Sequence, residues 1–156
     1  MIIVMIGLPG SGKSFHAKRL VEEHLKTPYS QAAIVSADDY FVGEDGVYRY
    51  EPTQIVAAQH SCFRNFLGFA STFKADKDLI VVDNTNLRNW HRSPYMMLGM
   101  ALGHQTKLVH VTCALETCVK RNTHDVPSEK LEDMFKSVEM PLPWWTYEVL
   151  ENYETP

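Results

Sequence analysis

Short apolar runs alternate along the chain with longer segments in which apolar residues recur at helical spacing. The runs are rich in β-branched residues, which is typical of strands buried on both faces of a parallel sheet. They cover residues 1–6, 32–36, 78–83 and 107–112. Helical periodicity is found over residues 13–26, 53–73, 87–102, 115–121 and 128–138. Strands that alternate with helices predict βαβ units with right-handed crossovers. We therefore expect an α/β fold in three layers, with a parallel sheet of about four strands flanked by helices.

The chain shows no stretch typical of an interdomain linker, and no repeat or low-complexity segment. We therefore expect residues 1–156 to form a single domain. The segment from about residue 140 onward carries Trp144, Trp145 and Tyr147, and it is too apolar to extend freely into water. This C-terminal tail is predicted to dock on the body of the domain.

Composition narrows the class of protein. The 156 residues are 45% hydrophobic and carry a net charge of −4. These values indicate a globular domain. The acidic net charge argues against the broad basic face of proteins that coat nucleic acid non-specifically, but it is compatible with a narrow basic channel for one strand end. Three cysteines without a CxxC pair indicate a reduced, cytoplasmic protein with no disulfide framework or zinc site, in which Cys113 and Cys118 pack in the core. The sequence shows neither a signal peptide nor an apolar run long enough to span a membrane.

The glycine-rich segment at residues 7–14 has the most specific chemical signature. It reads GLPGSGKS and fits the phosphate-binding pattern G-x-x-x-x-G-K-[ST], between a predicted strand and a predicted helix. Glycines let successive backbone N–H groups face an anion, and the N-terminus of the following helix adds partial positive charge. Lys13 is expected to reach the β- and γ-phosphates of ATP, and the Ser14 hydroxyl is expected to ligate Mg²⁺. The predicted ATP-binding residues are Gly7, Leu8, Pro9, Gly10, Ser11, Gly12, Lys13, Ser14 and Phe15.

Acidic residues follow two further predicted strands, at the sheet edge where ligands of parallel α/β proteins bind. Asp38 and Asp39 come after the second strand. A carboxylate there either accepts the proton of an acceptor hydroxyl or caps a turn, and spacing alone leaves both open. Asp83 ends the third strand, at the position where P-loop proteins hold Mg²⁺. Asn84 and Asn86 follow and are candidates for contact with the nucleotide, the acceptor or the loop itself.

Four segments together resemble the polynucleotide 5′-kinase domains of phage and animal end-repair enzymes and their less characterised P-loop relatives. They are GLPGSGKS at 7–14, SADDYF at 36–41, VVDNTN at 81–86 and VKRNTHDVPSEKL at 119–131. The resemblance reaches from the first strand to about residue 140. It implies a P-loop kinase fold with a helical lid around residues 121–130, ATP and Mg²⁺ as cofactors, and a 5′-hydroxyl end of single-stranded DNA or RNA as the acceptor. It also implies that Asp38 is the general base and that Arg121 is a lid arginine on the donor phosphates.

The sequence departs from this family where a substrate phosphate is held. Phe41 stands where phage members often carry a basic residue, and Ala37 stands where an arginine occurs. Phe41 either stacks on a base or packs in the core. Arg49, Arg88 and Arg92 are candidates for the missing phosphate contacts, and the last two share one face of a predicted helix.

Three functions compete at this point. The leading one is an ATP-dependent kinase of 5′-hydroxyl ends, with Lys13, Asp38 and Arg121 as catalytic residues and Ser14 and Asp83 as metal ligands. Its predicted acceptor-binding residues are Asp38, Asp39, Phe41, Asn84, Asn86, Arg88 and Arg92. A small-molecule kinase for a nucleoside, sugar or other metabolite is favoured by the acidic net charge and by Phe41. The third is a nucleotide-binding regulator that transfers phosphate slowly or not at all. His124 in the lid either contacts nucleotide or caps a turn.

Overall fold

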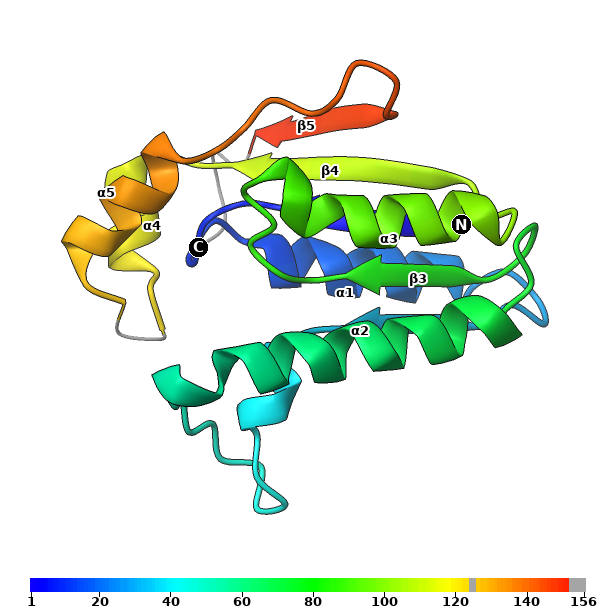
Figure 1. Cartoon of the computed structure of the whole chain (residues 1–156), viewed down its shortest axis with the longest axis horizontal. Helices are drawn as coiled ribbons and strands as arrows, with labels where there is room; N and C mark the ends of the chain where they lie inside the picture. Colours follow the sequence, from blue (N-terminus) through cyan, green and yellow to red (C-terminus); the bar gives the residue numbers. More distant parts are fainter. Residues whose placement is uncertain (124–125, 152–156) are drawn as a thin grey trace.

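The computed structural model describes residues 1–123 and 126–151. Within these residues the centre is a parallel sheet of five strands in the order β2-β3-β1-β4-β5 (Figure 1). The strands are β1 (Ile2–Ile6), β2 (Ala32–Val35), β3 (Leu79–Val82), β4 (Thr106–Thr112) and β5 (Tyr147–Glu151). Because β1 is the central strand, the glycine-rich loop that follows it lies at the middle of the carboxyl edge of the sheet.

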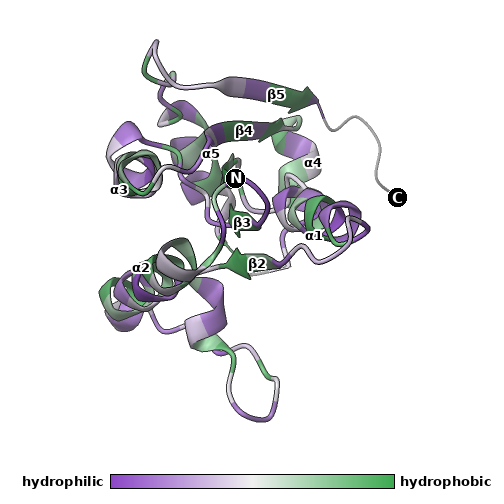
Figure 2. Ribbon diagram, turned by 90° about the vertical axis from the view of Figure 1, so that its right-hand side faces the viewer, coloured by the Kyte–Doolittle hydropathy of each residue, from purple (hydrophilic) through white to green (hydrophobic). Residues whose placement is uncertain are grey.

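Three long helices form the outer layers. Helix α1 (Lys13–His24) covers one face of the sheet, whereas α2 (Ile55–Thr72) and α3 (Asn89–Ala101) cover the other (Figure 2). The expected three-layer α/β fold is therefore confirmed, with helix bounds within about two residues of the expected ones.

The core has two sides because successive residues of a strand point to opposite faces. Val4 of β1 belongs to a cluster with Phe66 of α2 and Met96 of α3. Its neighbour Met5 belongs to a second cluster with Ala17 of α1. All five residues of β1 are buried, which explains the unbroken apolar run in the sequence.

The remaining helical elements lie beyond the carboxyl ends of the strands. Helices α4 (Leu115–Lys120) and α5 (Ser128–Lys136) pack against each other there (Figure 1). Two short 3₁₀ helices, η1 (Asp38–Phe41) and η2 (Pro52–Gln54), lie between β2 and α2. The lid expected around residues 121–130 thus contains the non-helical residues 121–123 and the start of α5, while 124–125 lie outside the described residues.

The sheet has one strand more than the sequence pattern predicted. The fifth strand arises because residues 147–151, which were expected in a docked tail, pair with β4 from Leu108–Tyr147 to Thr112–Glu151. Strand β5 lies at the edge and is only half-buried, so it lacks the apolar run of the inner strands. The tail does pack on the body, and Trp145 is buried in the larger core cluster.

No helix among the described residues is long and apolar enough to cross a membrane.

Candidate nucleotide and phosphoryl-transfer site

The glycine-rich loop has a backbone that only glycine adopts readily. Gly10 and Gly12 have φ angles of 77° and 94°, in the left-handed region that is unfavourable for residues with a Cβ. Gly10 also lies against α4, because a Cβ at this position would meet the carbonyl oxygen of Cys118 at 2.3 Å. The start of the loop is anchored by a hydrogen bond from the Gly7 N–H to the Thr85 carbonyl, 3.1 Å long. The backbone is therefore curled and held from both sides.

Lys13 is the first residue of α1 and is only 9% exposed. Its Nζ donates a hydrogen bond to the Leu8 carbonyl across the loop, at 3.2 Å. Burial lowers the pKa of Lys13, and the nearby carboxylates of Asp83 and Asp38 oppose this shift. A buried cation beside the curled phosphate loop is suited to an anionic phosphate chain.

Asp83 follows β3 and is also only 9% exposed. Its backbone N–H donates to the Val35 carbonyl at 2.9 Å, which fixes the residue against β2. The side-chain Oδ1 is buried and has no hydrogen-bond donor among the described residues. A buried, unpaired carboxylate oxygen is unfavourable unless a cation is present. Asp83 therefore fits the expected role as a Mg²⁺ ligand, with Ser14 lining the same cavity.

Within the described residues no group of three or more His, Cys, Asp or Glu side chains is placed to hold a metal. Mg²⁺ usually takes one or two protein ligands and completes its shell with water and phosphate oxygens.

Asp38 is the first residue of η1 and is exposed to the cavity. Two hydrogen bonds hold the turn in which it stands, one of them to the segment after β3. The Ala37 N–H donates to Oδ1 of Asn84 at 2.8 Å, and the Asp38 N–H donates to Oγ of Ser36 at 3.2 Å. Tyr48 donates its hydroxyl proton to Oδ1 of Asp38 at 3.4 Å. The carboxylate thus has one oxygen partnered by Tyr48 and stands on the same cavity as Lys13.

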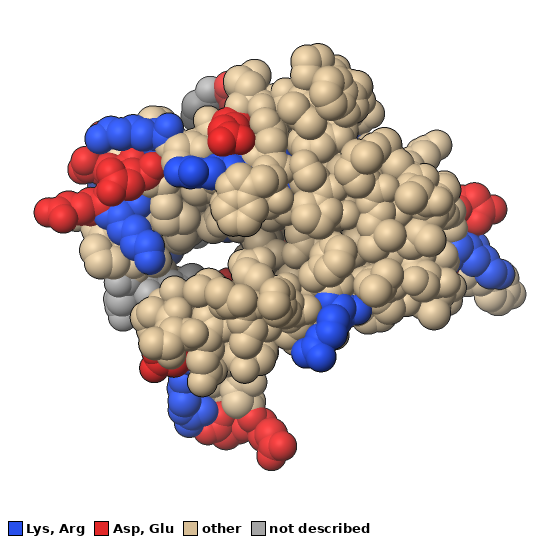
Figure 3. Space-filling model, in the orientation of Figure 1, with Lys and Arg blue, Asp and Glu red and all other residues tan. Residues whose placement is uncertain are grey.

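These segments meet around one cavity of about 580 Å³, at the carboxyl edge of the sheet. Figure 3 shows the hollow between the α4–α5 part of the molecule and the part that contains α2. Four sequence-distant segments contribute to its wall, and their predicted site residues there are Pro9, Gly10, Gly12, Lys13, Ser14, Phe15, Asp38, Asp83, Asn84 and Arg121. The structure thus brings the phosphate loop, the predicted base, the predicted metal ligand and the lid arginine together.

Part of the wall consists of residues that sequence reasoning missed. Tyr48 and Tyr50 come from the segment that leads into α2, and Ile55 and Gln59 come from the start of α2 itself. The opposite wall includes Thr123, Val126, Pro127, Lys130 and Met134. The two tyrosines stand in the segment EDGVYRY at 44–50, whose aromatic pattern was visible, but nothing local indicates that this loop folds back beside Asp38.

Phe41 and Asp39 of the DDYF segment were predicted to bind the acceptor, but neither is in the cavity wall. Phe41 is 5% exposed and packs edge-on against Tyr48 and Tyr50, with ring centroids 6.1 and 5.1 Å away. Phe41 was expected either to stack on a base or to pack in the core. The structure shows core packing, in which Phe41 supports the two tyrosines. Asp39 accepts a hydrogen bond from the Ser36 N–H at 3.3 Å, so it stabilises the turn, and partial burial raises its pKa.

Arg92 and Asn86 do not reach the cavity either. Arg92 is fully buried, and its guanidinium donates to the carbonyls of Asn86 and Leu87 at 2.6 Å each. Asn86 has a φ of 47°, is 3% exposed and donates its side-chain amide to the Met5 carbonyl at 2.8 Å. Both residues hold the turn after β3 in shape, because buried carbonyl groups need donors. The structure gives them this supporting place instead of contact with an acceptor.

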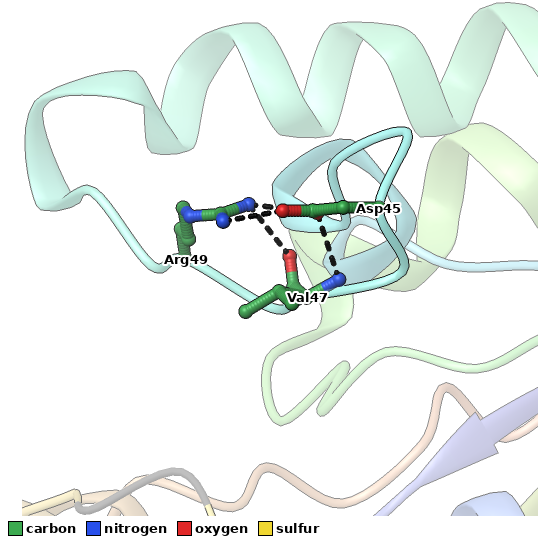
Figure 4. A network of polar contacts seen from close by, with 3 residues as sticks. All are labelled: Asp45, Val47 and Arg49. Atoms are coloured by element: carbon green, nitrogen blue, oxygen red, sulfur yellow. Dashed lines mark hydrogen bonds and ion pairs between the residues drawn. The ribbon is translucent and has the colours of Figure 1, made fainter.

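The other two candidate arginines are exposed outside the cavity wall. Arg88 is the cap residue before α3, and it is not among the residues that line the cavity. Arg49 points back along its own loop and forms a two-pronged pair with Asp45 (Figure 4), with Nη1 2.9 Å from Oδ1. His124 lies outside the described residues.

Comparison with known proteins places the chain in a family. The model of family AAA_33, described as an AAA domain, matches residues 2–141. The chain belongs to this AAA-domain family. The match spans the phosphate loop, both acidic turns and the α4–α5 region that form the cavity of this AAA domain.

Two curated relatives are NEDD4-binding protein 2 from Homo sapiens and YLP motif-containing protein 1 from Rattus norvegicus. They are 30% and 27% identical over 87% and 89% of this chain. The chain spans only 7% and 11% of the length of these relatives. The similarity is therefore to one segment of much larger proteins.

Solved structures confirm the P-loop kinase fold. Kti12 from Chaetomium thermophilum, in complex with ADP-AlF3, has a TM-score of 0.69 at 17% identity and covers 99% of this chain and 91% of its own. A gluconokinase from Sinorhizobium meliloti 1021 has a TM-score of 0.64 at 15% identity, and the match covers 98% of this chain and 83% of the gluconokinase chain. The APS kinase CysC from Mycobacterium tuberculosis, in complex with AMPPNP and APS, has a TM-score of 0.61 at 16% identity. The match covers 99% of this chain and 89% of the APS kinase chain.

Proposed function

We propose that the chain transfers the γ-phosphoryl group of ATP to the 5′-hydroxyl end of a DNA or RNA strand. The observation that carries this proposal is the placement of Asp38 on the same cavity as Lys13, Asp83 and Arg121. In-line transfer needs a donor phosphate held at one end, a base at the acceptor hydroxyl, and positive charge between them. The four residues together supply groups for all three tasks.

Each residue has a separate part in the reaction. The phosphate loop and Lys13 bind the phosphates, while Asp83 and Ser14 would hold Mg²⁺, which neutralises developing charge when it is bound. Asp38 accepts the proton of the acceptor hydroxyl, and the hydroxyl oxygen attacks phosphorus as the bond to the leaving oxygen breaks. Arg121 stabilises the charge on the transferring group.

The wall beside Asp38 favours a nucleoside end over a polyhydroxy acceptor. It contains Tyr48, Tyr50 and Ile55, with Gln59 and Asn84 as its two amides. Aromatic faces bind bases of any sequence by stacking, which is worth about 1–3 kcal/mol per base. A sugar or sugar acid would need more side-chain donors and acceptors than this wall provides.

A small-molecule kinase is the second candidate, and two observations favour it. The cavity of about 580 Å³ has the size of a typical small-ligand site. Apart from Lys13 and Arg121, the only cation among the described wall residues is Lys130, so the phosphate contacts expected for a long strand are few. A single nucleoside or another compact hydroxyl compound is the acceptor under this alternative.

The test is transfer of label from γ-labelled ATP with Mg²⁺. The acceptors are 5′-hydroxyl DNA and RNA oligomers, their 5′-phosphorylated counterparts, free nucleosides and gluconate. We expect label on the 5′-hydroxyl oligomers alone, reduced about 10²–10⁴-fold by Asp38→Asn because the base is lost. Asp45→Asn is the matched control, since Asp45 pairs with Arg49 on the same loop outside the cavity wall. Label on nucleosides or gluconate alone would establish the second candidate, and nucleotide binding without any transfer would refute both.

A further inference from the structure

Cys113 and Cys118 occupy two positions at the start of α4 that meet in space. Ala114 is the cap residue of α4, so Cys113 precedes the cap and Cys118 is the fourth residue of the helix. Side chains at these two positions commonly pack together and set the angle at which the chain enters a helix. Their side chains therefore lie on the same side of the first turn of α4. Both also belong to the small apolar cluster around Leu8 and Leu131.

The two thiols differ in access. Cys113 lines a second cavity of about 460 Å³, bordered by the end of β4, by α4 and by α5. Cys113 is partly exposed, whereas Cys118 is fully buried. A small reagent from solvent therefore reaches Cys113 first. Burial raises the pKa of the Cys118 thiol, with the neighbouring Cys113 as a further cause.

Cys118 is also in direct contact with the phosphate loop. Its carbonyl oxygen is so near Gly10 that only a glycine fits there. Its thiol is close enough to Lys13 and Arg121 for their charges to act on it, and both of these residues line the nucleotide cavity. The position of α4 relative to the end of β4 therefore affects the loop on one side and Arg121 on the other.

We propose that Cys113 and Cys118 form a reversible disulfide that weakens nucleotide binding by the phosphate loop. A disulfide holds two sulfur atoms about 2 Å apart, closer than two unbonded thiols can approach, so it draws the start of α4 toward the end of β4. This movement shifts the Cys118 carbonyl against Gly10 and moves Arg121, which caps the end of α4. In a reducing compartment the pair stays as two thiols, and the state with full affinity prevails.

The chemistry needs a peroxide or a small-molecule disulfide as the oxidant. With hydrogen peroxide, the Cys113 thiolate sulfur attacks one oxygen, the O–O bond breaks, and a sulfenic acid and water form after proton transfer. The Cys118 sulfur then attacks the Cys113 sulfur, the S–O bond breaks, and the thiol proton leaves with the hydroxide as a second water. Two thiols are oxidised by two electrons and one peroxide is reduced. With a small disulfide, exchange through Cys113 releases two small thiols.

The experiment treats the full chain with hydrogen peroxide, maps its disulfides by peptide mass spectrometry, and measures the affinity for a fluorescent ATP analogue. We expect a Cys113–Cys118 disulfide and affinity weakened on the order of tenfold, the usual size of coupling between two sites. Dithiothreitol should restore the affinity. The peptide that carries Cys62 should stay reduced, because Cys62 is buried in the main core.

The variant Cys113→Ser should keep full affinity in peroxide, and Cys118→Ala should do the same while Cys113 accumulates as a sulfenic acid. Because Cys113 is the more exposed of the two, Cys113→Ser carries the test if the buried substitution impairs folding. Oxidation of Cys113 to higher acids without the disulfide would overturn the proposal, as would a disulfide that leaves the affinity unchanged. The readout is nucleotide binding, so the proposal stands apart from the identity of the acceptor.

Discussion

Replacing Gly10 with alanine isolates the close contact between the phosphate loop and α4. Gly10 has a φ of 77°, and a Cβ there would lie 2.3 Å from the carbonyl oxygen of Cys118. Gly46 offers a matched control, because its φ is 73° and a Cβ there would meet nothing within 4 Å. Both substitutions introduce the same left-handed strain, but only Gly10→Ala adds a clash with backbone.

The magnitudes separate the two effects. An alanine in the left-handed region is unfavourable by about 1–2 kcal/mol, so Gly46→Ala should lower the free energy of unfolding by that amount. Forcing a methyl group into a packed region adds about 1–3 kcal/mol, because here the obstacle is a backbone carbonyl and not a flexible side chain. Gly10→Ala should therefore lower the free energy of unfolding by about 2–5 kcal/mol in total.

Urea denaturation followed by tryptophan fluorescence measures this difference, and titration with an ATP analogue measures the state of the loop. Gly10→Ala should also weaken nucleotide binding, since the loop must shift away from α4, whereas Gly46→Ala should bind normally. Equal destabilisation of the two variants would show that α4 yields without resistance. That result would refute both the close packing and its use in coupling Cys118 to the loop.

Three further predictions test the supporting residues. Arg92→Met should lower the free energy of unfolding, measured by urea denaturation, by about 2–4 kcal/mol, because the buried Asn86 carbonyl loses its guanidinium donor. The control Arg88→Ala, at an exposed arginine, should change it by less than about 0.5 kcal/mol. Equal effects of the two substitutions would contradict the buried role of Arg92. Asp83→Asn should raise the Mg²⁺ concentration needed for half-maximal nucleotide binding roughly tenfold or more, an effect that the exposed control Asp76→Asn should lack. Burial opposes ionisation of Asp78, yet hydrogen bonds from the N–H groups of Lys74 and Gln31 lower its pKa below the ordinary 3.8. The stability from this carboxylate is present above pH 3.8 and is lost as pH falls through the lowered pKa. In urea denaturation at several acidic pH values, the free energy of unfolding should therefore fall less steeply for Asp78→Asn than for the unchanged protein. Parallel curves of free energy against pH would contradict this.

The order of helices and strands followed from the sequence because those elements are encoded locally. A buried parallel strand needs an apolar run, and a surface helix needs an apolar stripe, so four strands and the main helices were visible in the pattern. Strand β5 was not, since an edge strand is half-buried and its residues 147–151 mix polar with apolar side chains. Its pairing with β4 depends on where the tail folds back, which no local pattern indicates.

The same division holds at the candidate site. The phosphate loop was predicted because its function depends on backbone geometry, and that geometry imposes glycines at fixed spacing within eight residues. Asp83 and Asp38 were placed correctly at the sheet edge because the carboxyl ends of parallel strands meet there. Arg92 was predicted to bind the acceptor, but it is buried against the turn between β3 and α3. Its spacing along the helix does not indicate whether that helix face is exposed or packed against this turn.

What the sequence alone determined is the α/β architecture and the identity of the phosphate loop, because both are set by short-range patterns. Only the tertiary structure decided which side chains share the cavity with that loop. Tyr48 and Tyr50 lie beside Asp38 because the long β2–α2 segment folds back over buried Phe41. Cys118 touches Gly10 because α4 returns to the carboxyl edge of the sheet. Such contacts between distant segments follow from how the whole core packs, and no stretch of residues encodes them by itself.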